Sequence, residues 1–349
     1  MTYHVTCSTD DNYLQHCVAM LCSMFENNKD MKMVVHLLVD SLSQESRNTI
    51  TSLSERYGNQ AMFYDMEPEM LENIQLNNTQ FNGKKMYSIA TYYRMFLPSL
   101  LPVDIDRILY LDCDIIVLQN VSELYGLNME GYGVAAVKDA TPFDSYHRFK
   151  MGLGLQHSAF CAGMMMINLD YWRKNECQKK LLKYANRQWK AVYMQDQDQD
   201  ALNYVFKDSW FQLPYKWGRT PLAVAPIDKS QRWFDILEYA NQPSIIHYAA
   251  HVKPWLDVWF PLQKHYWHYL KLSGFVNSKK THANTKLRAT IRKTVIRYYI
   301  NMYIHPFIPD SIELLLRDAV NIILFIFCIF KPHRFNEFML KRWCQKYNM

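Results

Sequence analysis

Two aspartates set one residue apart carry the strongest chemical signal in the chain. Asp112 and Asp114 directly follow the apolar run 108–111. In an extended segment residues i and i+2 point to the same side, so both carboxylates can face one cation while Cys113 points the other way. Carboxylate oxygens suit Mg²⁺ or Mn²⁺, which usually keep open positions for substrate phosphates. The pair predicts a metal site, although an isolated Asp-x-Asp more often marks a solvated turn.

The elements that position this pair are predicted from alternating strand and helix patterns. Apolar spacing indicates helices at residues 14–25 and around 50–53, the second opened by a capping box of Ser41 and Gln44. Residues 90–97 are expected to form a helix that Pro98 stops. Strand-like runs occupy residues 3–7, 33–39, 61–64, 107–111, 133–137, 164–169 and 244–248. This order predicts an α/β fold with a mostly parallel central sheet flanked by helices.

Polar side chains follow several of these predicted strands. Asp10 and Asn12 come after the first strand, Asp139 after the strand at 133–137, and His247 near the end of the last. Each alone is more often a turn former, a cap or a core histidine. Because ligands of such sheets collect beyond the carboxyl ends of strands, their joint placement predicts one site shared with Asp112 and Asp114.

Length and composition limit the possible classes of protein. With 349 residues, 49% of them hydrophobic, the chain can bury a substantial core and is not expected to be disordered. Its eight cysteines have no C-x-x-C spacing, which favours reduced, buried thiols in a cytoplasmic protein over a disulfide framework or a zinc site. No signal peptide is visible.

The basic charge is concentrated at the carboxyl end. Residues 281–349 hold 11 Lys and Arg against 4 Asp and Glu, which leaves 28 against 29 elsewhere. Without a basic and aromatic recognition pattern, nucleic-acid binding is not expected.

We predict a domain at 1–275 and a basic amphipathic helical tail at 276–349, peripheral on an anionic membrane surface at its cytoplasmic face. A stripe through Leu287, Ile291, Val295, Tyr298 and Met302 supports the tail helix, and the apolar run 319–330 is too short to span a bilayer. The alternative is an ordinary amphipathic helix packed on the domain.

Four ordered segments resemble glycosyltransferase family 8, which includes bacterial lipopolysaccharide galactosyl- and glucosyltransferases and glycogenin. They are STDDNY at 8–13, SIATYYR at 88–94 together with LYLDCD at 109–114, DQDALN at 198–203, and HYAAHVKPW at 247–255. The resemblance implies a GT-A fold and a retaining hexosyltransferase that uses UDP-galactose or UDP-glucose with Mn²⁺ or Mg²⁺. It also implies a glycan or lipid-linked acceptor in lipopolysaccharide or other cell-surface polysaccharide biosynthesis.

The resemblance also implies roles for individual residues. The metal ligands would be Asp112, Asp114 and His247. The donor would contact Asp10, Asn12, Arg94 and Cys113, with Lys253 at its phosphates, and the sugar and acceptor would lie among the catalytic residues Asp139, Asp198 and Gln199.

Two departures from the family pattern are visible. Cys161-Ala162-Gly163 stands where the family often has Asn-x-Gly, and Ala250 stands where it often has Gly. The first change removes a carboxamide expected to contact the sugar, and the second can alter a close backbone approach to phosphate.

The residues leave the mechanism and two other functions open. Our mechanistic hypothesis is same-face attack with Gln199 stabilising the anomeric centre, and the alternative is a covalent intermediate on a carboxylate. The competing functions are a metal-dependent nucleotidyltransferase and a non-catalytic, membrane-attached sugar-nucleotide-binding protein.

Overall fold

The structure is a computed structural model of the chain. It describes residues 2–71, 80–81, 84–85, 89–139, 151–153, 157–186, 198–221, 242–249, 252–276 and 278–303.

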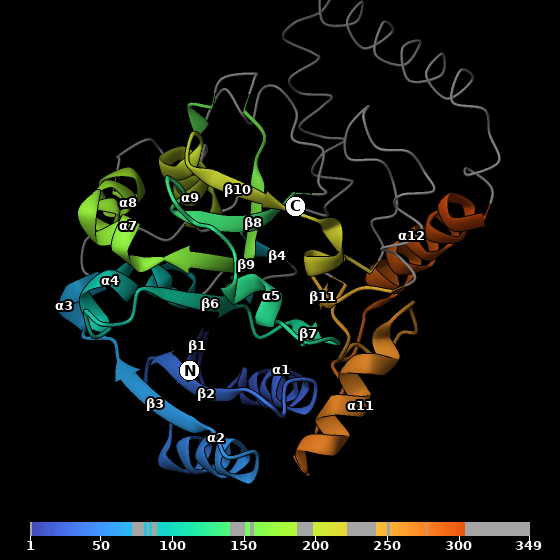
Figure 1. The fold of residues 1–349 in the computed structure, drawn as a ribbon. Coiled ribbons are helices and arrows are strands. Elements are labelled where there is room, and N and C mark those ends of the chain that lie inside the picture. Colours follow the sequence, from blue (N-terminus) through green and yellow to red (C-terminus); the bar gives the residue numbers. More distant parts are fainter. Residues whose placement is uncertain are drawn as a thin grey trace, which may run out of the picture.

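A seven-stranded sheet forms the centre of the fold (Figure 1). Its strands lie in the order β10-β8-β9-β6-β1-β2-β3. Every neighbouring pair is parallel except those made by β9, which runs antiparallel to both β6 and β8. The predicted α/β fold with a mostly parallel sheet is confirmed. The strands are β1 (Thr2–Thr9), β2 (Lys32–Val39), β3 (Gln60–Asp65), β6 (Arg107–Leu111), β8 (Val134–Lys138), β9 (Phe160–Asn168) and β10 (Trp210–Leu213).

Both faces of the sheet are buried, which explains why its strands read as apolar runs. Along β6, Leu109 and Leu111 belong to one core cluster, while Ile108 and Tyr110 belong to a second. The first cluster is covered by α1 (Leu14–Glu26), α2 (Gln44–Arg56) and α11 (Gln263–Ser273). The second is covered by the 3₁₀ helix η1 (Ile89–Phe96), α7 (Leu169–Lys174), α8 (Cys177–Ala185) and α9 (Asp198–Phe206). Helices thus flank the sheet on two sides (Figure 1).

The last predicted strand lies outside the main sheet. It is β11 (Ile245–His247), which pairs antiparallel with β7 (Ile115–Val117), a strand that the sequence reading did not separate from β6. The strand β10 was not predicted either. The remaining short elements are α3 (Pro68–Leu71), β4 (Gln80–Phe81), β5 (Lys84–Lys85), α4 (Leu97–Leu100), α5 (Ser122–Tyr125) and η2 (Tyr215–Gly218).

Two predicted helix boundaries were wrong. The cap of α2 is Ser43, whose hydroxyl accepts the Ser46 N–H, whereas Ser41 lies outside the helix with φ 54°. Residues 89–96 form a 3₁₀ helix, and Pro98 lies in the first turn of α4 instead of stopping a helix. Proline is tolerated there because the first-turn N–H groups have no partner within the helix.

The tail helix α12 (Thr285–Tyr303) packs on the domain. On its predicted stripe, Ile291 is 0% exposed and Tyr298 is buried, while Leu287 and Val295 are partly buried against the first core cluster. An ion pair of 2.6 Å joins Arg288 to Asp257. These contacts agree with the packed-helix alternative for Leu287, Ile291, Val295 and Tyr298, while the side chain of Met302 lies outside the described residues and the membrane role of the tail stays a prediction.

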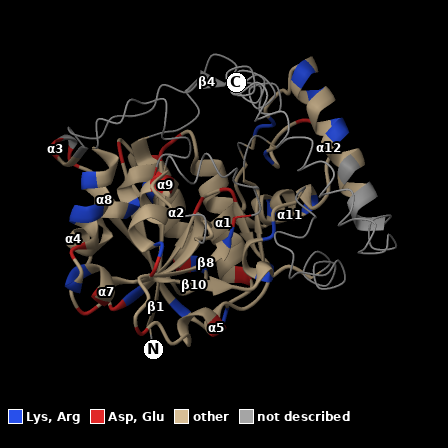
Figure 2. Cartoon of the chain, turned by 90° about the horizontal axis from the view of Figure 1, so that it is seen from above, with Lys and Arg blue, Asp and Glu red and all other residues tan. Residues whose placement is uncertain are grey.

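The membrane prediction is not tested by the described residues, which leave both basic and apolar side chains of α12 exposed, the apolar ones being Ile296 and Tyr299. Figure 2 shows basic residues along α12, and Lys286, Arg292 and Lys293 are exposed. The run 319–330 lies outside the described residues, and the boundary at 275/276 stays a prediction. Among the residues that the structure describes, no helix has the length and apolar character needed to cross a bilayer.

The capping assignment gives a stability prediction. Ser43→Ala should lower the free energy of unfolding by about 1 kcal/mol, because it removes the acceptor of the Ser46 N–H. Ser41→Ala is the matched control, since its hydroxyl donates to the exposed Asp40 alone among its described contacts, and it should cost less than about 0.5 kcal/mol. Urea denaturation measures both, and equal losses would contradict the assignment.

Candidate active site

Asp112, Asp114 and His247 lie together, with one potential ligand atom from each within 4.8 Å of the others. Nε2 of His247 is 3.3 Å from Oδ1 of Asp114 and 3.9 Å from Oδ2 of Asp112. In an octahedral Mg²⁺ or Mn²⁺ site, adjacent ligand atoms are roughly 3 Å apart. The geometry is therefore compatible with a shared cation. Asp112 and His247 are 135 positions apart in sequence, and they come together as expected from their places at the ends of predicted strands.

Backbone hydrogen bonds position the three candidate metal ligands, Asp112, Asp114 and His247. The N–H of Asp112 donates to the carbonyl of Gly163 on β9 at 2.8 Å. Beyond the main sheet, His247 is the partner of Ile115 in the β7–β11 pair, and the Tyr248 N–H donates to the Asp114 carbonyl at 3.0 Å. The site thus lies where β6 passes into β7, between the main sheet and the small one.

Arg94 holds Asp112 in place from η1. Its Nη2 donates to Oδ1 of Asp112 at 2.9 Å, and the Tyr110 hydroxyl donates to the same oxygen at 2.9 Å. The guanidinium also donates to the Ala162 carbonyl at 2.6 Å and lies 4.0 Å from the centre of the Tyr110 ring. Arg94 therefore supports Asp112, and its predicted contact with the donor stays a prediction.

Asp198 and Gln199 open α9 on the other side of Arg94. Nε of Arg94 is 3.1 Å from Oδ2 of Asp198. Burial raises the pKa of Asp198 to about 6, although the Arg94 charge opposes the rise and the Asp112 charge adds to it. The Gln199 amide accepts the Ala162 N–H at 2.9 Å and donates to Asp139 at 3.0 Å. The three predicted catalytic residues are therefore linked to the metal-ligand candidates through Arg94 and Ala162.

Cations surround the buried Asp114 carboxylate. Lys253 Nζ is 2.5 Å from its Oδ2 and donates to the Tyr248 carbonyl at 3.0 Å. Burial favours the neutral acid, but the charges of Lys253 and His247 lower the pKa of Asp114 overall. In turn, burial would lower the pKa of His247 and of Lys253, and the Asp114 charge raises both. Asp114 is therefore an anion at neutral pH.

The remaining predicted donor contacts lie around the first helix. Asp10 Oδ1 accepts the Tyr13 N–H at 2.9 Å, and Asn12 is exposed beside it. The Tyr13 ring is 44% exposed and meets the Trp255 ring edge-on at 6.2 Å between centroids. The Cys113 thiol points away from the carboxylates, as strand alternation predicts, and donates to the Ser8 carbonyl at 3.2 Å. A nucleotide-sugar donor would therefore contact Cys113 through its backbone, which stays a prediction.

Two residues of β9 that received no role from the sequence contact His247. Sγ of Cys161 is 3.4 Å from Nδ1 of His247. A Cβ added at Gly163 would lie 2.2 Å from Cε1 of the same ring. Cys161 and Gly163 are two positions apart and therefore lie on the same face of the strand. Their approach to the site could have been predicted from this spacing if the pairing of β9 with β6 had been known.

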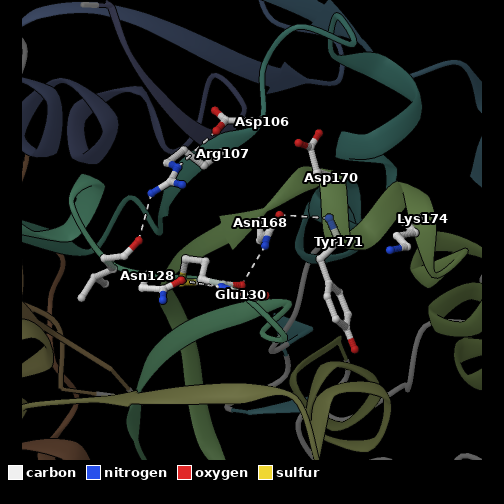
Figure 3. A pocket seen from close by; sticks show the side chains of 10 residues that line it. Asp106, Arg107, Asn128, Glu130, Asn168, Asp170, Tyr171 and Lys174 are labelled. Carbon is white, nitrogen blue, oxygen red and sulfur yellow. Dashed lines mark hydrogen bonds and ion pairs between the residues drawn. The ribbon is translucent and has the colours of Figure 1, made fainter.

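A separate polar hollow of about 310 Å³ lies at the opposite end of β6 (Figure 3). Arg107 donates there to the Tyr125 and Leu127 carbonyls, and Asn168 donates to those of Met129 and Tyr132. These side chains are engaged in holding backbone carbonyls, so we assign the hollow a structural role.

Comparisons with known proteins agree with this geometry. The family model described as glycosyl transferase family 8 matches residues 4–258. Among curated proteins, general stress protein A of Bacillus subtilis (strain 168) is 26% identical over 274 residues, covering 76% of this chain and 92% of that protein. Lipopolysaccharide 1,2-glucosyltransferase of Escherichia coli is 25% identical over 257 residues, covering 73% and 74%.

A solved structure of the galactosyltransferase LgtC, in complex with donor and acceptor sugar analogues, shares the fold. It superposes with a TM-score of 0.67 at 24% identity, covering 82% of this chain and 99% of that one. The family match includes part or all of every strand of the main sheet and every residue of the candidate site, so the chain belongs to glycosyl transferase family 8 and is a glycosyltransferase.

Proposed function

We propose that the protein is a retaining, metal-dependent hexosyltransferase that moves galactose or glucose from a UDP-sugar to a glycan or lipid-linked acceptor. The convergence of Asp112, Asp114, His247 and Lys253 carries this proposal. Negative charge develops on a nucleoside diphosphate as it leaves. At this cluster a bound cation and Lys253 could stabilise that charge. The family match and the lipopolysaccharide enzyme among the relatives favour a cell-surface glycan as product.

The residues fit a Mn²⁺ or Mg²⁺ ion. Oδ1 of Asp114 is buried and has no hydrogen bond of good geometry in the described part of the chain, with Nε2 of His247 nearby. Two carboxylates and an imidazole are ligands that Mn²⁺ accepts. Held by Asp112, Asp114 and His247, such an ion would supply Lewis-acid charge to the oxygens of the diphosphate.

The protein's own side chains would position the reacting groups. Arg94 fixes one oxygen of Asp112 and leaves the other directed toward His247. Asp198 is buried and ion-paired with Arg94, which makes it a poor free nucleophile and favours same-face attack over a covalent adduct on this residue. One lone pair of the Gln199 carbonyl is held by the Ala162 N–H, and within the described part of the chain the second would be left for the anomeric centre.

We place the enzyme on the cytoplasmic face of an anionic membrane through its basic tail, residues 281–349. Because Ile291 and Tyr298 of the stripe are buried, we assign the described part of this contact mainly to the exposed charges of Lys286, Arg292 and Lys293. Each such charge is worth about 1 kcal/mol near an anionic surface.

The metal assignment predicts loss of transfer when either aspartate is changed. Asp112→Asn and Asp114→Asn should each reduce UDP release from UDP-galactose or UDP-glucose, with Mn²⁺ and an acceptor glycan, by roughly 100-fold or more. Asp106→Asn, at the exposed opposite end of β6, should keep wild-type activity. Wild-type rates in either site variant would reject the metal role.

Analysis of the products separates the competing functions. Acceptor-dependent release of UDP supports the transferase, whereas pyrophosphate release from a nucleoside triphosphate would identify a nucleotidyltransferase. Binding of UDP-sugar without turnover, over a broad panel of acceptors, would instead favour the non-catalytic protein.

Replacing Lys253 should change Mn²⁺ affinity and the rate of transfer in opposite directions. Its ammonium shares the Asp114 carboxylate with any bound cation, so Lys253→Met should strengthen Mn²⁺ binding while slowing transfer on the order of 10-fold through loss of a phosphate contact. Mn²⁺ titration by electron paramagnetic resonance and UDP release measure the two effects. Lys216→Met, which breaks a pair with Glu123 away from the site, should change neither. Weaker Mn²⁺ binding in Lys253→Met would contradict the shared-carboxylate account.

The tail prediction concerns vesicle binding. Replacing Lys286, Arg292 and Lys293 by Gln should weaken co-sedimentation with phosphatidylglycerol vesicles by 10-fold or more, at about 1 kcal/mol per charge. The control replaces Lys179, Lys180 and Lys183 of α8, an equal charge change on another exposed helix. Equal losses in the two triple variants would reject a specific role for α12.

A further inference from the structure

The imidazole of His247 is in contact with β9 on the side away from Asp114. Its Nδ1 is 3.4 Å from Cys161 Sγ, and its Cε1 lies close over Gly163, where a Cβ would come within 2.2 Å. Cys161 is partly exposed and Gly163 is buried, and both face the ring from the same side of the strand. The proposed function uses His247 but gives no task to this thiol.

A histidine that ligates through Nε2 must carry its proton on Nδ1. Here Nε2 is the ring nitrogen directed at Asp114 and Asp112, so Nδ1–H needs an acceptor. The Cys161 sulfur lies within hydrogen-bond range of Nδ1, and sulfur can accept weakly. Outer partners of this kind fix both the tautomer and the orientation of metal-binding histidines.

The orientation is the more demanding requirement. A half-turn of the ring about its Cβ–Cγ bond exchanges Nε2 with Cε1 and Nδ1 with Cδ2. In the turned ring a carbon would face Asp114, and the metal-binding set would lose its nitrogen. Because Gly163 offers only a flat backbone surface to the ring, shape alone does not distinguish the two orientations, whereas a hydrogen bond from Nδ1 to sulfur does.

We propose that Cys161 is a positioning residue of the active site: its sulfur accepts the Nδ1–H of His247 and holds Nε2 toward Asp112 and Asp114. The inference rests on the proposed metal role of His247 and adds a residue to it. Outer partners of metal-binding histidines contribute 10- to 100-fold to metal affinity, so the effect is large enough to measure.

The first test is Mn²⁺ affinity in the presence of saturating UDP, followed by electron paramagnetic resonance of the free ion. Cys161→Ala should weaken binding about 10-fold or more, while Cys161→Ser, which keeps an acceptor on the same Cβ, should remain within about 3-fold of wild type. Cys22→Ala is the matched control, since that buried thiol contacts the Tyr57 hydroxyl away from the site. It should leave the affinity unchanged.

The second test observes the ring directly and does not depend on turnover. With ¹⁵N-labelled histidine and diamagnetic Mg²⁺ plus UDP, wild-type His247 should show one tautomer with the proton on Nδ1, identified by its loss in His247→Gln. Cys161→Ala should show a mixed or changed pattern, and Cys161→Ser should restore the single tautomer.

The outcomes separate the inference from the function beneath it. Wild-type Mn²⁺ affinity in Cys161→Ala, or an unchanged His247 spectrum in that variant, overturns the role of Cys161 and leaves the metal site standing. A wild-type protein that binds no Mn²⁺ with UDP rejects the proposed function and the inference together. Selective loss in Cys161→Ala with recovery in Cys161→Ser supports the inference.

Discussion

The site depends on the compensation of buried negative charge. Asp114 has an exposed side-chain fraction of only 11%, and an uncompensated carboxylate at such a place would take up a proton. Without a bound metal, Lys253 and a protonated His247 supply the compensating charge for Asp114, as Arg94 does for Asp112 and Asp198, and a metal held by Nε2 would take the place of the His247 proton. These cations come from η1, from β11 and from the segment after β11, so distant parts of the chain must assemble before the carboxylates can be ionised and buried.

The sequence was sufficient for the parts of this arrangement that depend on local pattern. Alternation extended beyond β6 predicted that Asp112 and Asp114 face one side and Cys113 the other, and the structure places the side chains so, although residues 113–114 form a turn between β6 and β7. The direction of β9 is not a local property, because a buried strand reads as the same apolar run whether it lies parallel or antiparallel to its neighbour. The approach of Cys161 and Gly163 to His247 therefore could not be derived from their own segment. Lys253 was assigned through the family resemblance alone.

Two assignments depend on tertiary contacts that the local sequence does not contain. Ser41 and Ser43 both precede the same helix, and which of them caps it depends on backbone angles that tertiary contacts such as the Asp11–Ser46 hydrogen bond select. The stripe of α12 is apolar for reasons that a periodic pattern cannot distinguish, since a protein core and a membrane interface reward the same spacing. Ile291 packs against the domain, and the membrane role of the tail stays a prediction.

The same charge balance constrains how the site can work. A dication added beside Asp112 and Asp114 would share the Asp114 carboxylate with Lys253, whose nitrogen is 2.5 Å from one of its oxygens, and two cations on one carboxylate repel by roughly several kcal/mol in a partly buried setting. The repulsion decreases if the ammonium turns from the carboxylate to an anionic ligand. A diphosphate supplies that anion, so the metal and the nucleotide should favour one another's binding, and the buried lysine couples them. Under the proposed function, Lys253 would pair with the ionised Asp114 before the donor binds and with the departing diphosphate afterwards.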